Sequence, residues 1–407
     1  MKYVIIGSAL EGNKGAASML EAAMQTITKA DKAAEVTLLS MYPTADAKLN
    51  TYKNLRILPA KPLFLGLALN PLGLLYWVLP PLRPLLRRQR HVRAIAEADA
   101  YLDQGGITFV DGREVFLLYN IASIWPALFM KTPVIKCAQA MGPFKSRLNR
   151  WAAKIFLPRM ELICARGEKT HQSLQKLQLD NVSLVADYAF LLEITTPERR
   201  KAEKLLAARG YDKSHLNIGV FPSEVLRKKM AKKGGDYEGV VAGLIDQITT
   251  KHQKATVYLL PHSQRATDKR HNNDVPVCDA IYERVSDQAR CTYIKQPTSP
   301  QQLRTIIESM DVAVVARFHA MVSALAVKTP VLVTGWSHKY QEVLDMFELQ
   351  DAAFDVSDIS ADMVYTHLQS TIKNKKTMER TIARHLPAVR RSAQAQVIAI
   401  IKTAQKK

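Results

Sequence analysis

The first half of the chain alternates short apolar runs with longer amphipathic stretches. The opening run, residues 3–7, has no polar alternation, and a helical pattern from Lys14 to about Ala30 follows it. An uninterrupted apolar run is typical of a strand that is covered on both faces, as in a parallel sheet. The same pattern predicts strands at residues 35–41, 55–58, 100–102, 133–137, 162–165 and 182–186. Strands separated by helices predict a doubly wound α/β domain.

A change of character between Glu193 and Tyr211 marks the expected domain boundary. A charged helix there has Pro197 at its first turn and Gly210 past its end, which is the usual helix punctuation. A second series of strands is predicted at residues 217–221, 255–260, 291–294, 312–315, 331–334 and 352–356.

The pattern therefore predicts two Rossmann-like domains. We expect the first at residues 1–195 and the second at 205–386, facing each other across a cleft. After Pro387, an amphipathic helix is expected from Ala388 to Ala404, and we expect residues 388–407 to pack back on the first domain.

One apolar segment interrupts this pattern. Residues 63–82 hold no charged residue, but Asn70 and the prolines at 71, 80 and 81 break them up, so a membrane-spanning helix is not expected. Arginines follow at positions 83, 87, 88, 90 and 93. Two interpretations stay open: residues 63–93 lie in the interface of an anionic membrane, or they form an apolar helical pair that covers the sheet or makes a dimer contact.

Amino-acid composition indicates which kinds of molecule the protein binds. Lys plus Arg number 57 and Asp plus Glu number 37, so the net charge is 57 − 37 = +20, which favours an anionic partner. The basic residues are spread along the chain without interleaved aromatics, so we expect no nucleic-acid binding. Cys137, Cys164, Cys278 and Cys291 form no C-x-x-C pair and are expected to be reduced core thiols. The residues after Met1 do not form a secretory leader, and we expect a cytoplasmic protein.

Ligands in open parallel sheets bind beyond the carboxyl ends of the strands, so the loops there carry the candidate chemistry. The loop after the first strand contains Gly12, Asn13 and Gly15 and offers free amides at a helix start. Gly105 and Gly106 follow a later strand and allow a backbone to approach a ligand closely.

Basic residues follow three other predicted strands. Arg166 ends a strand in the first domain and can direct its planar guanidinium at a carboxylate or phosphate. Arg317 and His319 are two positions apart at a strand end, so both are expected to face one ligand. In the next loop, Ser337 can cap a helix and Lys339 can hold a phosphate.

A metal site is not expected. His262, Asp268 and Asp274 follow a predicted strand of the second domain and are residue types that bind metals. Their spacing matches no metal motif, so we expect neither a metal nor an organic cofactor.

Several short motifs, taken in order, resemble the polysaccharide pyruvyl transferases. They are Gly12-Asn13-x-Gly15, Gly105-Gly106 with Asp111, Met141-Gly142-Pro143-Phe144, Ala165-Arg166-Gly167-Glu168, Asp187-Tyr188-Ala189-Phe190, Arg317-Phe318-His319-Ala320 and the loop with Lys339. The similarity extends from about residue 5 to 348.

This resemblance implies a GT-B-like fold and the transfer of pyruvate from phosphoenolpyruvate to two hydroxyls of a saccharide, as a cyclic ketal, with release of phosphate. Arg166, Arg317, His319, Ser337 and Lys339 would then bind the donor, and His319, assisted by Arg317, would protonate its methylene carbon. Gly12, Asn13, Gly15, Gly105 and Gly106 would contact the acceptor. A lipid-linked acceptor would fit membrane attachment through residues 63–93. The oligomeric state stays open between a monomer and a homo-oligomer.

A nucleotide-sugar glycosyltransferase would share this architecture and would also need cations for its donor. The second domain shows no clear acidic partner for a nucleotide ribose. Nucleotide-sugar glycosyl transfer is the alternative function to test.

Overall fold

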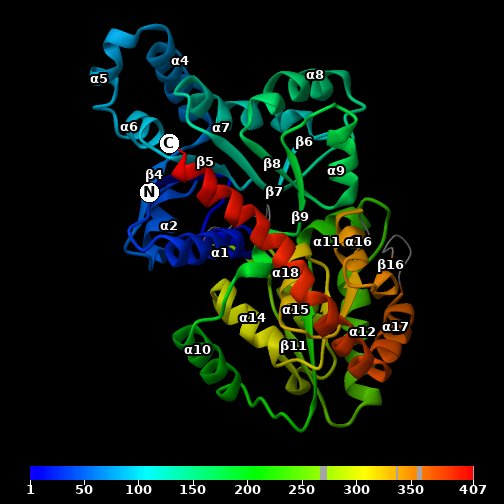
Figure 1. The fold of residues 1–407 in the computed structure, drawn as a ribbon. Coiled ribbons are helices and arrows are strands. Elements are labelled where there is room, and N and C mark those ends of the chain that lie inside the picture. Colours follow the sequence, from blue (N-terminus) through cyan, green and yellow to red (C-terminus); the bar gives the residue numbers. More distant parts are fainter. Residues whose placement is uncertain (266–272, 336–337, 355–359, 407) are drawn as a thin grey trace. The chain divides into compact units, whose positions relative to one another are not determined.

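The structure, a computed structural model, describes residues 1–265, 273–335, 338–354 and 360–406. The chain forms two compact units. Unit 1 comprises residues 1–11, 19–192 and 390–407, and unit 2 comprises residues 12–18 and 193–389. Each unit holds one parallel sheet flanked by helices (Figure 1), which confirms the predicted fold class of two parallel α/β domains.

The sheet of unit 1 has the strand order β4-β3-β1-β5-β7-β8-β9, with β6 paired to β7, and these pairs are parallel. Its strands are β1 (Lys2–Ile6), β3 (Glu35–Ser40), β4 (Leu55–Pro59), β5 (Ala100–Asp103), β6 (Ile107–Val110), β7 (Val134–Gly142), β8 (Leu162–Arg166) and β9 (Val182–Val185). The prediction missed β6, and β7 runs five residues beyond the expected end at Cys137. The apolar run stops there, but the strand continues through residues 138–142 because β6 pairs with it at Ala140 and Gly142.

The helices of unit 1 connect these strands, and α1 begins in unit 2. They are α1 (Lys14–Ala30), α2 (Pro43–Leu49), α3 (Pro62–Phe64), α4 (Asn70–Val78), α5 (Arg83–Leu86), α6 (Arg90–Ala96), α7 (Leu117–Phe129), α8 (Arg147–Phe156) and α9 (Glu168–Gln175). Short helical turns η1 (Leu65–Leu69) and η2 (Pro80–Leu82) join α3 to α4 and α4 to α5. The apolar segment thus forms consecutive short helices. No single described helix is long and apolar enough to cross a bilayer; residues 62–78 and 80–86 reach that length only together, and they are bent by 118°.

The sheet of unit 2 has the parallel order β13-β11-β10-β14-β15-β16. Its strands are β10 (Leu216–Phe221), β11 (Ala255–Leu259), β13 (Cys291–Tyr293), β14 (Val312–Val315), β15 (Val331–Thr334) and β16 (Ala353–Phe354). Its helices are α10 (Thr196–Ala207), α11 (Glu224–Ala231), α12 (Tyr237–Lys251), α13 (Val275–Arg284), α14 (Pro300–Glu308), α15 (Phe318–Ala326), α16 (His338–Asp345) and α17 (Ala361–Lys373). Residues 355 and 356, the predicted end of the last strand, lie outside the described residues.

The last helix, α18 (Lys375–Gln405), begins thirteen residues before the predicted start at Ala388 and contains Pro387. The prediction treated Pro387 as a helix start, because an interior proline removes one hydrogen bond and costs about 3 kcal/mol. One buried face continues through the proline and outweighs this cost; it consists of Ile382, Leu386, Val389, Ala393, Val397, Ile400 and Ala404. From Arg390 onward the helix belongs to unit 1, where Ser392 Oγ accepts from Ala186 N at 3.0 Å.

Both sheets are the centres of apolar cores. In unit 1, Val4, Ile6 and Tyr101 pack with residues of α7 and α8, and in unit 2, Val220, Val257 and Val314 pack with residues of α12 and α13. The four cysteines are buried free thiols, which confirms the prediction that they are core residues.

Candidate active site

The turn at residues 12–15 belongs to unit 2, where a short strand holds it. Strand β2 (Gly12–Asn13) pairs antiparallel with β12 (Ser263–Gln264), which follows β11. Gly12 has φ +79°, a conformation that glycine adopts without strain, and the Arg265 side chain lies over it. Asn13 Oδ1 accepts from Gly15 N at 3.0 Å and fixes the entry into α1. The turn is therefore ordered by its own side chains and by β12.

His319 lies directly against Gly15. A Cβ atom built on Gly15 would be 2.1 Å from His319 Nδ1 and 2.4 Å from Cγ, so only glycine leaves room for the imidazole. Gly15 lies in the first turn of α1 and His319 in the first turn of α15. Two helix N-termini thus meet at this contact, and their positive dipole ends favour an anion.

Arg317, two residues earlier, is held by a buried carboxylate. Its Nε donates to Asp274 Oδ2 at 2.9 Å, and its Nη2 donates to Oδ1. Asp274 also accepts from Ser263 N at 2.8 Å and from Glu224 N at 3.0 Å. Burial lowers the pKa of Arg317, but the Asp274 carboxylate raises it by more, so the guanidinium stays charged. The Arg317 side chain keeps 17% of its surface exposed.

A second histidine lies behind this pair. His262 is buried at the end of β11, next to β12. Burial, and then the charges of His319, Arg317 and Lys14, hold the pKa of His262 well below its usual 6.5. His262 is therefore neutral at pH 7. A hydrogen bond to the backbone of His319 opposes this shift and joins the imidazole to the first turn of α15.

Lys14 and Lys339 add cations around His319. Lys14 is buried, with 7% of its surface exposed, and it is close enough to His262 to lower the pKa of that imidazole. Lys339 Nζ lies 5.5 Å from the centre of the Phe318 ring, which stacks edge-on against the His319 ring at 5.0 Å. The structure therefore brings three of the predicted second-domain residues, Arg317, His319 and Lys339, to one end of the unit 2 sheet.

The fourth predicted residue of this group, Ser337, lies outside the described residues, as does Asp268. In the parts of the chain that the structure does describe, no group of three or more His, Cys, Asp or Glu side chains is arranged to hold a metal ion.

Arg166, Gly105 and Gly106 belong to unit 1, where they form a separate network. Arg166 Nη1 donates to Asp187 Oδ2 at 2.8 Å, and Nη2 donates to the Gly106 carbonyl at 3.1 Å. The Arg166 side chain is 5% exposed. These bonds fix the glycine loop to the end of β8, so the contacts of Arg166 that the structure shows are structural.

A buried ion pair also holds the Gly105-Gly106 loop in place. Lys136 Nζ lies 2.6 Å from Asp103 Oδ2, and both side chains are buried. Asp103 Oδ1 accepts from Gly105 N at 2.9 Å, and Gln139 Nε2 donates to the Asp103 carbonyl at 2.7 Å. The Gly105-Gly106 loop is therefore rigid and presents backbone rather than side chains.

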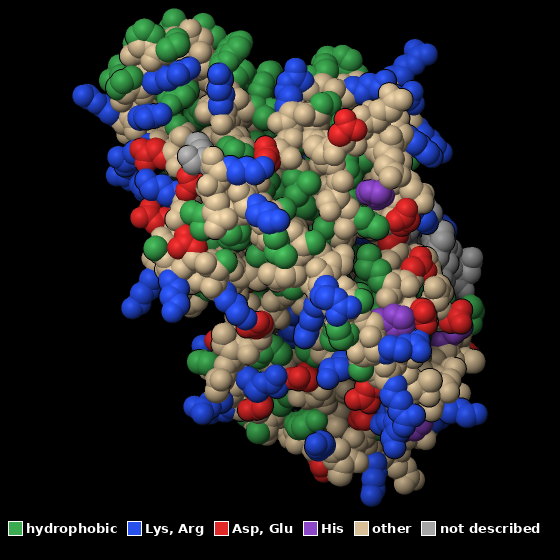
Figure 2. All heavy atoms as spheres, viewed as in Figure 1, with side chains coloured by type: hydrophobic (Ala, Val, Ile, Leu, Met, Phe, Trp, Pro, Cys, Tyr) green, Lys and Arg blue, Asp and Glu red, His purple; other side chains and the backbone are tan. Residues whose placement is uncertain are grey.

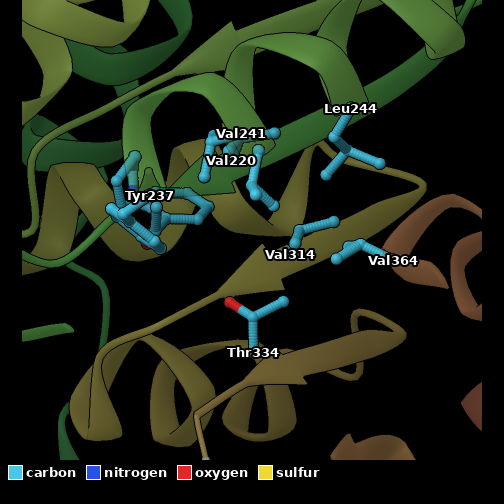
Figure 3. A pocket seen from close by; sticks show the side chains of 10 residues that line it. Val220, Tyr237, Val241, Leu244, Val314, Thr334 and Val364 are labelled. Atoms are coloured by element: carbon cyan, nitrogen blue, oxygen red, sulfur yellow. The ribbon is translucent and has the colours of Figure 1, made fainter. Parts of the chain in front are cut away.

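Unit 2 also contains a small apolar hollow between its sheet and α12. Figure 3 shows Val241 and Leu244 of α12 facing Val220 and Val314 of the sheet, with Thr334 on the opposite side. Among the described residues, no Lys, Arg or His lines it. A doubly charged ligand therefore fits the Arg317 and His319 cluster and not this hollow.

Sequence reasoning missed four residues of the cluster. Asp274 and His262 were weighed only as metal ligands, and Lys14 and Arg265 were not considered. Lys14 could have been found, because it lies between Asn13 and Gly15 in the same motif. Arg265 reaches the Gly12 turn because β2 pairs with β12, two segments about 250 residues apart in the chain, and Asp274 reaches Arg317 from the loop before α13.

Solved structures of two-domain sugar enzymes share this fold. UDP-GlcNAc 2-epimerase from Neisseria meningitidis, bound to UDP-GlcNAc, aligns with a TM-score of 0.64 at 11% identity over 99% of this chain and 100% of that chain. UDP-GlcNAc 2-epimerase from Methanocaldococcus jannaschii aligns with a TM-score of 0.59 at 12% identity over 95% and 100%. Trehalose-6-phosphate synthase OtsA aligns with a TM-score of 0.57 at 11% identity over 100% and 99%. The chain therefore has the GT-B fold, and at these identities the likeness shows the fold alone.

A match to a protein family is more specific than this likeness in fold. The model of the polysaccharide pyruvyl transferases matches residues 13–338, and this chain belongs to that enzyme family. The match begins in the Gly12–Gly15 turn and ends just before Lys339, so it includes both Arg317 and His319. The resemblance seen in the short motifs is confirmed.

Proposed function

We propose that the protein transfers pyruvate from phosphoenolpyruvate to two hydroxyls of a saccharide, as a cyclic ketal, in the assembly of a cell-surface polysaccharide. Family membership supports a pyruvyl transferase acting on a polysaccharide. The choice of phosphoenolpyruvate as the donor rests on one observation: Lys14, Arg317 and His319 lie together at two helix N-termini in unit 2. Phosphoenolpyruvate carries a carboxylate and a phosphate, and such a ligand needs several fixed cations.

Each residue of the cluster has a role in this proposal. Arg317 binds an oxygen pair of the donor with the guanidinium edge that Asp274 leaves open, and Asp274 fixes its orientation. Lys14 and Lys339 neutralise the phosphate. Ser337, predicted to cap the next helix, stays a predicted donor contact.

His319 acts as the general acid. Its imidazolium gives a proton to the methylene carbon of the donor while the first hydroxyl attacks the adjacent carbon, and the proton of that hydroxyl restores the imidazolium. The second hydroxyl then attacks the same carbon, the bond from that carbon to the phosphate oxygen breaks, and phosphate leaves with the second proton. These steps balance without a metal or an organic cofactor.

We propose that unit 2 binds the donor and unit 1 most of the acceptor. Gly15 lies against His319, and Gly12 and Asn13 belong to the same turn of unit 2, which supports a place for the reacting hydroxyls next to the acid. Gly105 and Gly106, in unit 1, would contact the rest of the saccharide through their backbone. A donor contact from Arg166 stays a prediction, because its guanidinium is bonded to Asp187 and Gly106.

Ligand-dependent melting tests the choice of donor. Phosphoenolpyruvate at 100 times its dissociation constant should stabilise the folded protein by about 2.7 kcal/mol, whereas UDP- and ADP-sugars should leave the melting temperature unchanged. Arg317→Met should abolish the shift. Stabilisation by nucleotide sugars and none by phosphoenolpyruvate would replace this proposal with nucleotide-sugar glycosyl transfer. Phosphate release with a panel of nucleotide- and lipid-linked sugars would then identify the acceptor.

A further inference from the structure

Unit 1 exposes large apolar side chains on three neighbouring elements. We call this set the apolar surface; it comprises Leu63, Leu67 and Trp77 on the segment from α3 to α4, Trp125 on α7, and Leu148 and Trp151 on α8. Leu67 is 78% exposed, and the three tryptophans are 50%, 41% and 59% exposed. Figure 2 shows hydrophobic atoms gathered at the end of unit 1 where Figure 1 places α4 and α5. Large exposed apolar patches on a folded protein mark interaction sites.

The segment from α3 to α4 is apolar on both of its faces. Its inner face buries Leu65, Leu69 and Tyr76, which pack in the core of unit 1. Its outer face carries Leu67, Leu74 and Trp77 instead of the charged residues that the outer face of a soluble surface helix normally has. A segment of this kind is favourable only when a second apolar phase covers its outer face.

Aromatic contacts connect the three elements. The Trp77 ring lies 6.1 Å from Phe129, Phe129 stacks on Trp125 at 5.3 Å, and Trp125 meets Phe156 of α8 edge-on at 5.7 Å. Gly73 allows α4 to approach α7 closely, since a Cβ there would be 3.2 Å from Pro126. These contacts pack α4, α7 and α8 against one another. Half-exposed tryptophans are typical of the boundary between water and lipid.

Basic residues accompany the apolar surface, without acidic ones. Residues 61–96 contain six Lys and Arg and no Asp or Glu, and residues 144–160 contain five and none. Arg88 and Arg90, beside α5, and Arg147 and Lys154, on α8, are exposed. A protein partner would have to supply all the negative charge, whereas an anionic lipid surface supplies it everywhere.

The bend after α4 is held by arginine contacts. Arg87 donates to Tyr76 Oη at 2.7 Å, and Arg83 donates to the Tyr76 carbonyl at 3.0 Å, with its guanidinium 5.1 Å from the ring centre. These bonds hold residues 62–86 in the folded conformation. A bent helical segment with arginines at its bend can lie in the membrane interface, with its apolar side chains toward the acyl chains and the arginines at the lipid phosphates.

We propose that the apolar surface docks on the interface of a membrane rich in anionic lipid, with Leu67, Trp77 and Trp125 among the acyl chains and the arginines at the phosphates. This inference does not rest on the proposed reaction. It extends the expectation for residues 63–93 to α7 and α8, which the sequence pattern did not mark.

Vesicle flotation of the full chain tests the proposal. We expect binding to vesicles with 30% phosphatidylglycerol and much weaker binding to phosphatidylcholine alone. Leu63→Glu/Leu67→Glu should lower the partition coefficient by roughly tenfold or more. Arg88→Gln/Arg90→Gln should lower it by about 25-fold, at about fivefold for each charge, and added salt should remove the difference.

Matched controls are available in unit 2. Val225→Glu/Met363→Glu places two carboxylates at exposed apolar positions, and Lys232→Gln/Lys233→Gln removes two exposed charges. Both controls should bind vesicles within about twofold of the wild type. All these positions are exposed, so melting temperatures should stay within a few degrees of the wild type.

Three results would overturn the proposal. The first is wild-type protein that does not float with anionic vesicles. The second is equal loss of binding in the control and surface variants. The third is a lipid-free dimer that Leu63→Glu/Leu67→Glu dissociates while vesicle binding is unchanged, which would assign the apolar surface to a second copy of the chain.

Discussion

The contact between Gly15 and His319 offers a substitution that adds one methyl group and reaches the proposed acid directly. In Gly15→Ala, the new Cβ would be 2.1 Å from His319 Nδ1, whereas ordinary contact begins at about 3.4 Å. The imidazole must therefore move by about 1.3 Å. A misplacement of about 1 Å at a reacting group costs roughly 100-fold in rate. We expect kcat for phosphate release at saturating phosphoenolpyruvate to fall by about that factor.

The fold should tolerate the same change. Gly15 lies in the first turn of α1 without a positive φ, and alanine favours a helix by up to about 1 kcal/mol over glycine. Displacing the ring costs about 1–3 kcal/mol, so the net loss of unfolding free energy should stay near 2 kcal/mol or below. Gly66→Ala is the matched control, because no atom lies within 4 Å of its Cβ, and it should keep full activity. A Gly15→Ala variant with wild-type kcat would refute the placement of His319 at the reacting carbon.

Other variants separate the roles of the cluster. Arg317→Lys loses the planar fork that pairs with Asp274, and we expect kcat/KM for phosphoenolpyruvate to drop by roughly 10- to 100-fold in initial-rate assays. Lys14→Met should raise KM for phosphoenolpyruvate by about tenfold with a smaller change in kcat, and an unchanged KM would remove Lys14 from the donor site. Because the folded pKa of His262 is depressed, its neutral form stabilises the protein above pH 6.5, and that stability is lost as the pH falls below about 6.5, by about 1.4 kcal/mol per pH unit. Denaturant titrations between pH 7 and 5 should show this slope, and His262→Gln should flatten it. Arg166→Ala removes the ion-pair partner of the buried Asp187 carboxylate and should cost about 3–5 kcal/mol of unfolding free energy in the same titrations. A donor contact from Arg166 predicts that KM for phosphoenolpyruvate also rises, and an unchanged KM would remove Arg166 from the donor site.

The fold was predictable where local pattern and tertiary structure agree. The buried strands β1, β10 and β14 contain the uninterrupted apolar runs 3–6, 218–221 and 312–315. Helix α10 has Pro197 in its first turn and ends at Ala207, three residues before Gly210, which has φ +75°. Strands β2 and β12 carry no such pattern, since each has two residues, and they pair with each other from distant parts of the chain. Strand β6 follows β5 after three residues with no helix between them, so the alternation of strands and helices does not mark it. The continuation of α18 through Pro387 depends on the buried face of the helix, which outweighs a local breaker.

In the candidate site, the residues that follow strands were predictable, but their partners from distant parts of the chain were not. Arg317 and His319 follow an obvious strand, so their position beyond its carboxyl end could be inferred. The inference from two-residue spacing on an extended strand was wrong, because Arg317 caps α15 and His319 lies in its first turn. That Asp274 holds Arg317 could not be inferred, because the partner comes from the loop before α13. The structure assigns the Gly12–Gly15 turn to unit 2, whereas its place in the sequence put it in the first predicted domain. Sequence spacing identifies which residues end strands, but it does not identify which loops share a unit.

Proton transfer from His319 to the donor is the central claim, and turnover in D₂O tests it most directly. Phosphoenolpyruvate and an acceptor saccharide are incubated with wild-type protein or with His319→Gln, and the product methyl group is observed by NMR. We expect the wild type to release phosphate and form a ketal whose methyl group carries one deuterium, and His319→Gln to bind phosphoenolpyruvate in melting assays but to form this product at least about 100-fold more slowly. Equal rates of deuterated product from both proteins would contradict the account.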